Sequence, residues 1–121
     1  MKTGLAIILA SALLLPAAAH ASSPACDVSV QFGSYAMGID GRAFDKVQRY
    51  VAGHPRLIRT SSVTSWGREG EKTDCLTTRT PNGQNVAFAA IRRLVGKGQR
   101  GPVEVRTLNG RVWSSHPPSG R

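Results

Sequence analysis

The sequence has few side chains of the kinds that perform catalysis. It contains three histidines, and its 7 aspartates and glutamates are outnumbered by 16 lysines and arginines. Only His54 and His116 lie beyond the N-terminal segment, the first beside a predicted helix end and the second near the C-terminus. An enzyme needs a positioned base, nucleophile or metal, and this material is too sparse to indicate one. We therefore expect a non-enzymatic domain that uses no cofactor and no metal.

Several motifs that would indicate other activities are also missing. The glycines at positions 33, 38 and 41 do not have the spacing of a nucleotide-binding loop. No Cys-x-x-Cys pair is present, and no internal repeat appears. After an apolar run at residues 5–15, no stretch approaches the roughly 20 residues that span a bilayer. The sequence thus predicts no integral membrane segment once the N-terminal run has been removed.

The N-terminus has the pattern of a secretory signal. Lys2 precedes the short apolar run, and Ala19-His20-Ala21 is the small-x-small pattern cut by signal peptidase. We expect a signal peptide at residues 1–21, a single domain at 22–113 and a disordered tail at 114–121, which is rich in proline, serine and glycine. The mature protein would then be periplasmic or secreted.

The mature chain is strongly basic. Removing residues 1–21 removes one lysine, which leaves 15 lysines and arginines against 7 acidic residues, a net charge of about +8. Such a surface attracts nucleic acid, acidic lipid or acidic glycan. An exported protein meets little nucleic acid, so no nucleic-acid partner is expected. Solubility and residence in the cell envelope are an equally good explanation of the charge.

Two cysteines, Cys26 and Cys75, remain in the exported chain. Thiols normally pair in oxidising compartments, so one disulfide is expected. A redox or metal-binding thiol pair is the alternative, and no neighbouring histidine supports it.

Hydrophobic periodicity predicts five strands and two helices. Strands are expected at 27–32, 57–66, 71–79, 102–107 and 111–113, and helices from Gly41 to about Gly53 and from a cap at Asn85 to Gly96. Residues 33–40 are interpreted as a strand-to-helix corner in which Asp40 caps the first helix. The Gly67–Gly70 and Asn109-Gly110 stretches are expected to be hairpin turns.

Apart from the short fifth strand at its end, this order is β-α-β-β-α-β, which predicts an α+β fold of the ferredoxin-like type, an antiparallel sheet with two helices on one face. In that topology the first strand lies beside the third, which brings Cys26 and Cys75 together. The predicted core comprises Val28, Val30, Phe32, Phe44, Val47, Val51, Ala87, Ile91, Leu94, Val103 and Val105.

Two groups of residues are candidates for binding. Arg42, Lys46 and Arg49 recur at helical spacing and form a basic stripe, although a solvated face explains the same pattern. In the turn at residues 66–71, Trp66 stands near Arg68 and can stack on a sugar or enter a partner's pocket. Trp66 can equally well close one end of a small core.

The stretch VQFGSYA, Val30 to Ala36, resembles the first strand and turn of SPOR domains, small modules of the bacterial cell envelope. The resemblance implies the βαββαβ order, a periplasmic location and binding to peptidoglycan glycan strands stripped of their peptides. The VxVGPF-like motif that SPOR domains usually carry in their third strand is replaced here by Cys75-Leu76-Thr77-Thr78-Arg79.

Together these observations predict a binding domain of the cell envelope that recognises peptidoglycan glycan, another anionic polymer or a protein partner. A small secreted enzyme, or a protein inhibitor that uses the turn at residues 66–71, is the alternative.

Overall fold

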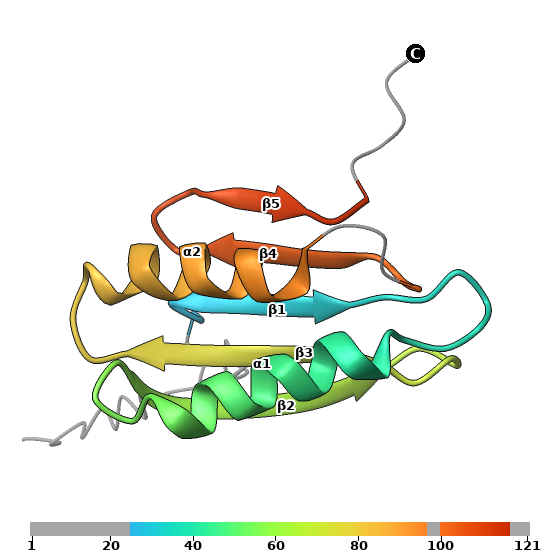
Figure 1. Cartoon of the computed structure of the whole chain (residues 1–121), viewed down its shortest axis with the longest axis horizontal. Coiled ribbons are helices and arrows are strands. Elements are labelled where there is room, and N and C mark those ends of the chain that lie inside the picture. Colours follow the sequence, from blue (N-terminus) through green and yellow to red (C-terminus); the bar gives the residue numbers. More distant parts are fainter. Residues whose placement is uncertain (1–24, 97–99, 117–121) are drawn as a thin grey trace, which may run out of the picture.

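The chain folds into one antiparallel sheet with both helices packed on the same face (Figure 1). The computed structural model describes residues 25–96 and 100–116. The elements are β1 (Val28–Phe32), α1 (Gly41–Gly53), β2 (Ile58–Trp66), β3 (Glu71–Thr78), α2 (Gly83–Val95), β4 (Val103–Thr107) and β5 (Val112–Ser114). The predicted α+β class and its antiparallel sheet are confirmed. The predicted signal peptide, residues 1–21, lies outside the described residues.

The sheet has the strand order β2-β3-β1-β4-β5. β1 is central and pairs with β3 on one side and β4 on the other, so Val30 lies between Asp74 and Val105. β2 and β3 form the expected hairpin, and Gly67 and Gly70 in its turn have positive φ angles of 73° and 81°. β2 and β5 are the two edge strands, and every β2 residue after Ile58 is exposed.

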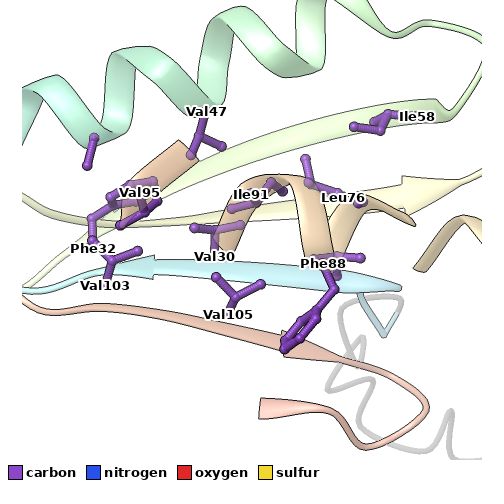
Figure 2. Close-up of a cluster of buried hydrophobic side chains, with 13 residues drawn as sticks. Val30, Phe32, Val47, Ile58, Leu76, Phe88, Ile91, Val95, Val103 and Val105 are labelled. Carbon is purple, nitrogen blue, oxygen red and sulfur yellow. The ribbon is translucent and has the colours of Figure 1, made fainter. Parts of the chain in front are cut away.

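The core lies between the sheet and the two helices (Figure 2). Alternate residues of β1 and β4 point into it, as the period of two predicts. The buried apolar residues are Val28, Val30, Phe32, Ala43, Val47, Ile58, Leu76, Ala87, Phe88, Ile91, Val95, Val103 and Val105. Of the predicted core, Phe44 and Val51 are only partly buried, and Leu94 is half-buried.

The buried side of α2 includes the predicted Ala87 and Ile91, together with Phe88, which the predicted core omits. Val86, the apolar residue before Ala87, is 47% exposed, whereas Phe88 is buried. Figure 2 shows the Phe88 side chain reaching from α2 toward β4. Burying a phenyl ring removes more apolar surface from water than burying a valine, so the helix is oriented to bury Phe88.

One of the two predicted helix caps is present. Asp40 accepts a hydrogen bond from the Ala43 amide over 3.0 Å and caps α1, as expected. α2 instead begins at Gly83, before the predicted cap Asn85. The Gly83 amide donates to the Thr80 hydroxyl over 3.1 Å, so a threonine in the preceding turn satisfies this helix end.

The folded domain extends past its predicted boundary at residue 113. Ser114 belongs to β5, and Ser115 is buried. The Ser115 amide donates to the Val103 carbonyl, and its hydroxyl accepts from the Val103 amide, both over 2.9 Å. This hydroxyl satisfies a backbone group at the start of β4, which a composition-based prediction of a disordered tail cannot detect. Residues 117–121 of the predicted tail lie outside the described residues.

The predicted disulfide is present between Cys26 and Cys75, with their Cα atoms 5.2 Å apart. Cys75 is opposite Ser29 of β1, so the bond ties β3 to the segment that leads into the neighbouring strand β1. Within the described part of the chain, neither helix has the length and apolarity needed to traverse a membrane.

Candidate functional site

The face of the sheet turned away from the helices is polar. Strand alternation places the side chains between the core positions on this open face, and the pairing register sets which of them are neighbours. Gln31 of β1 lies between Thr73 of β3 and Glu104 of β4. Trp66 of β2 is opposite Glu71 on the same face, at the outer end of the hairpin.

An open groove of about 340 Å³ lies on this face, at the end where β1 leaves the sheet. Its lining comes from every strand and from the segments beside them: Gln31, Gly33, Ser34, Trp66, Glu71, Pro102, Glu104 and Ser114. Three of these residues, Gln31, Gly33 and Ser34, belong to the VQFGSYA stretch. The corner after β1 is therefore also part of the groove, whose side chains offer amide, hydroxyl, carboxylate and indole groups.

Local hydrogen bonds fix the shape of this corner. The Gly33 amide donates to the Pro102 carbonyl over 2.8 Å, which ties the start of the loop to the segment before β4. The Ser34 hydroxyl oxygen accepts from the amides of Ala36 and Gly38 over 3.0 and 2.9 Å. Both of these residues have positive φ angles, 80° for Ala36 and 86° for Gly38. The loop is thus a defined wall of the groove.

Trp66 is exposed and held in position. Its side chain is 43% accessible, and its indole N–H donates to the Thr73 hydroxyl over 2.9 Å. Thr73 is on the neighbouring strand, two positions further along than Glu71, the residue opposite Trp66, and therefore lies on the same face. This bond limits rotation of the ring, so little side-chain entropy remains to be lost when a ligand packs on it.

The charged groups in the groove are acidic. Glu71 accepts a hydrogen bond from the Glu69 amide over 2.6 Å, and Glu104 forms an ion pair with Arg106 over 2.5 Å. Glu71 is thereby held opposite Trp66, and Glu104 is held beside Gln31. Such a surface favours ligands that donate hydrogen bonds through hydroxyl or amide groups.

The predicted basic stripe lies elsewhere. Arg42, Lys46 and Arg49 surround a shallow hollow on the outer side of α1, together with Asp45. α1 covers the buried face of the sheet through Ala43 and Val47, whereas Trp66 points from the other face. The structure therefore brings the three cations together but does not place them beside Trp66. Arg68 is exposed in the β2–β3 turn and does not line the groove.

Local sequence patterns do not single out Gln31, Glu104 or Ser114 as binding residues. Alternation indicates that Gln31 and Glu104 face outward, but their adjacency depends on the register between β1 and β4. Ser114 falls within the predicted disordered tail at 114–121 but belongs to β5.

The two described histidines lie outside the groove. His54 is bonded through its ring Nδ1 to the Tyr50 carbonyl over 2.7 Å, and His116 makes an edge-to-face contact with Tyr35. No cluster of three or more metal-binding side chains occurs within residues 25–96 and 100–116.

Comparisons with protein-family models, with curated proteins and with solved structures found no match to this chain.

Proposed function

We propose that this protein is an exported, non-enzymatic binding domain of the bacterial cell envelope whose groove on the open sheet face holds a peptidoglycan glycan strand. The observation that carries the proposal is that three residues of the VQFGSYA stretch, Gln31, Gly33 and Ser34, line the same groove as the exposed Trp66. The predicted signal peptide and the Cys26–Cys75 disulfide support the periplasm or the exterior as its location.

The chemistry of the groove suits a sugar chain. A pyranose ring has an apolar face that can pack on an indole, and its hydroxyl and acetamido groups form hydrogen bonds with amides, hydroxyls and carboxylates. Trp66 supplies the first kind of contact, and Gln31, Glu71 and Glu104 supply the second. The groove is open to solvent and lined by residues from all five strands, so a polymer can enter it from the side.

The fold assignment forms part of the same proposal. With β5 counted as an addition at the β4 edge, the order β2-β3-β1-β4 supports a ferredoxin-like split βαβ arrangement. This arrangement and the VQFGSYA stretch are the two features that resemble SPOR domains.

A second mode of binding, to an anionic polymer, is favoured by the hollow between Arg42, Lys46 and Arg49. Asp45 lies in the same hollow and offsets part of its charge. Because Trp66 faces the other way, the two modes can be separated by substitution.

The test measures retention of the purified protein on sacculi with and without their stem peptides. We expect Trp66→Ala and Gln31→Ala to abolish or strongly reduce retention, and removal of the stem peptides to increase it. Both side chains lie outside the core, so neither substitution should unfold the domain. The matched control is the Arg42/Lys46/Arg49→Ala triple variant, which should be retained like the parent.

A salt series separates stacking from charge attraction. Retention through the groove should change little with ionic strength, whereas retention through the basic stripe should fall steeply as the Debye length shortens to about 8 Å at physiological salt. Loss of retention in the triple variant but not in Trp66→Ala would replace the glycan groove with the anionic-polymer mode. Negligible retention of every protein would end the envelope-binding proposal and favour a protein partner at the turn of residues 66–71.

A further inference from the structure

A second groove, here called the arginine groove, lies between α2 and β5. It has a volume of about 470 Å³ and is lined by Phe88, Ala89, Arg92, Arg93, Gly96, Arg111 and Trp113. Trp113 is opposite Val105 of β4 and therefore faces the helix layer, away from the glycan groove. Phe88 and Trp113 both contact the core and give this groove an aromatic floor.

The charge of the arginine groove is not compensated. Three arginines line it, and no acidic residue does. All three are exposed, and none forms an ion pair or side-chain hydrogen bond within the described part of the chain. Arg106 provides the contrast, since it pairs with Glu104 on the open face. Three like charges around one hollow repel one another, so an anion that entered it would relieve this repulsion.

Stabilisation of α2 explains the positions of Arg92 and Arg93 but not that of Arg111. Arg92 and Arg93 lie in the last turn of α2, where cations interact favourably with the helix dipole. Arg111 comes from the segment that connects β4 to β5, far along the chain, and has no such role. Its backbone forms the turn, with its N–H donating to the Thr107 hydroxyl over 2.9 Å, while its side chain turns to the groove.

The geometry points to a phosphoryl group as the ligand: we propose that the arginine groove binds a phosphate monoester whose apolar part rests on Trp113. A planar, singly charged carboxylate is satisfied by one guanidinium fork. A phosphate monoester carries a charge of between −1.5 and −2 near neutral pH and presents three strong acceptor oxygens, so it can engage several forks at once. The aromatic floor then accommodates the group to which the phosphate is attached.

The experiment uses phenyl phosphate as the soluble probe and fluorescence as the readout. The chain has two tryptophans, so a Trp66→Phe background leaves Trp113 as the only indole. Phenyl phosphate should change its emission in a saturable manner, and benzoate should bind roughly tenfold more weakly or not at all. Arg111→Gln should weaken phenyl phosphate binding by roughly tenfold or more, because a charge-assisted bidentate contact is lost.

Arg59→Gln is the matched control, since it removes the same charge from β2, at the opposite edge of the sheet. It should bind phenyl phosphate like the parent, and equal melting temperatures for both variants would show that Arg111→Gln remains folded. Vesicles that contain phosphatidic acid in phosphatidylcholine test a lipid as the source of the phosphate. Binding to them that depends on Arg111 supports the proposal with a membrane ligand, and binding to phenyl phosphate alone supports it with a soluble one.

Three results would overturn the proposal. They are the absence of saturable binding to both probes, equal affinity for benzoate and phenyl phosphate, and equal losses in Arg59→Gln and Arg111→Gln. The last result would show only a general attraction to the net charge of the protein.

Discussion

Trp66 and Thr73 are joined across the β2–β3 pair by an indole N–H to hydroxyl bond of 2.9 Å on the open face of the sheet. This bond fixes the orientation of the Trp66 ring before any ligand binds. Binding of a glycan should therefore depend on a residue that does not line the groove.

Thr73→Val should weaken glycan retention several-fold without unfolding the domain. Valine keeps the branched shape that suits a strand but cannot accept the indole hydrogen bond, so the ring becomes free to rotate. Thr64→Val is the control, because Thr64 is opposite Thr73 on the same face and does not bond to Trp66. Retention on sacculi measures the effect, and equal behaviour of the two variants would show that the bond does not position the ring.

Loss of the disulfide should lower stability substantially. Cys26 and Cys75 are separated by 49 residues, and closing a loop of this size stabilises a fold by about 4 kcal/mol in the chain-entropy model. The Cys26→Ser/Cys75→Ser double variant should show that loss in denaturant unfolding, and the reduced parent should behave in the same way. A double variant as stable as the oxidised parent would contradict this expectation.

The contribution of Asp40 to stability should depend on pH. Burial by itself raises the pKa of this carboxyl group, but hydrogen bonds from the amides of Ala43 and Arg100 outweigh it and lower the pKa below its usual value. A lowered pKa in the folded state means that the stabilisation is complete above the unfolded pKa of about 4 and disappears as the pH falls through the folded value.

Asp40→Asn should therefore cost about 1 kcal/mol at neutral pH, because the charged cap is lost. As the pH falls from about 4 through the lower folded pKa, the unfolding free energies of variant and parent should converge. Urea unfolding across this range measures both quantities. A difference that stays constant down to the lowest pH would show that the charge of Asp40 does not matter.

Ala36→Gly and Gly38→Ala should change the stability of the fold in opposite directions. Ala36 has a φ of 80°, where a side chain is strained, so Ala36→Gly should stabilise the fold by up to about 1 kcal/mol. Gly38 has a φ of 86°, and an added Cβ would meet the Glu69 carbonyl only at an ordinary contact distance of 3.8 Å. Gly38→Ala should therefore destabilise by about 1 kcal/mol, through strain alone. Thermal unfolding of the two variants tests the signs.

The element order was accessible from the sequence because β1, β4 and α1 have clean local periodicity, and the turns at Gly67–Gly70 and Gly110 have the residues that such turns require. The burial of Phe88 on α2 was not. Val86 and Phe88 are both apolar, and only the position of β4 decides which is buried. Asp74 was not anticipated either: it is fully buried, and its carboxylate accepts bonds from Gln48 of α1 and Ser61 of β2 over 2.7 and 2.6 Å.

The candidate groove could not be predicted for a related reason. Local pattern shows that Gln31, Trp66 and Glu104 face outward or lie at a turn, and the predicted topology sets β1 beside β3. Neither gives the register that makes Gln31 and Glu104 neighbours. Sites assembled from several strands depend on long-range pairing, whereas the basic stripe on α1 depends on local helical spacing alone. This is why the stripe was found and the groove was not.

The position of the disulfide also determines what a protease can release. The exposed turn around Arg68 lies inside the loop closed by Cys26 and Cys75, so a cut there produces two pieces that remain covalently joined. Trypsin nicking at Arg68 should leave the protein at full mass on a non-reducing gel and yield two fragments only after reduction. A cleaved turn would thus stay attached to the sheet, and limited proteolysis can be used to sever the β2–β3 connection without separating the strands.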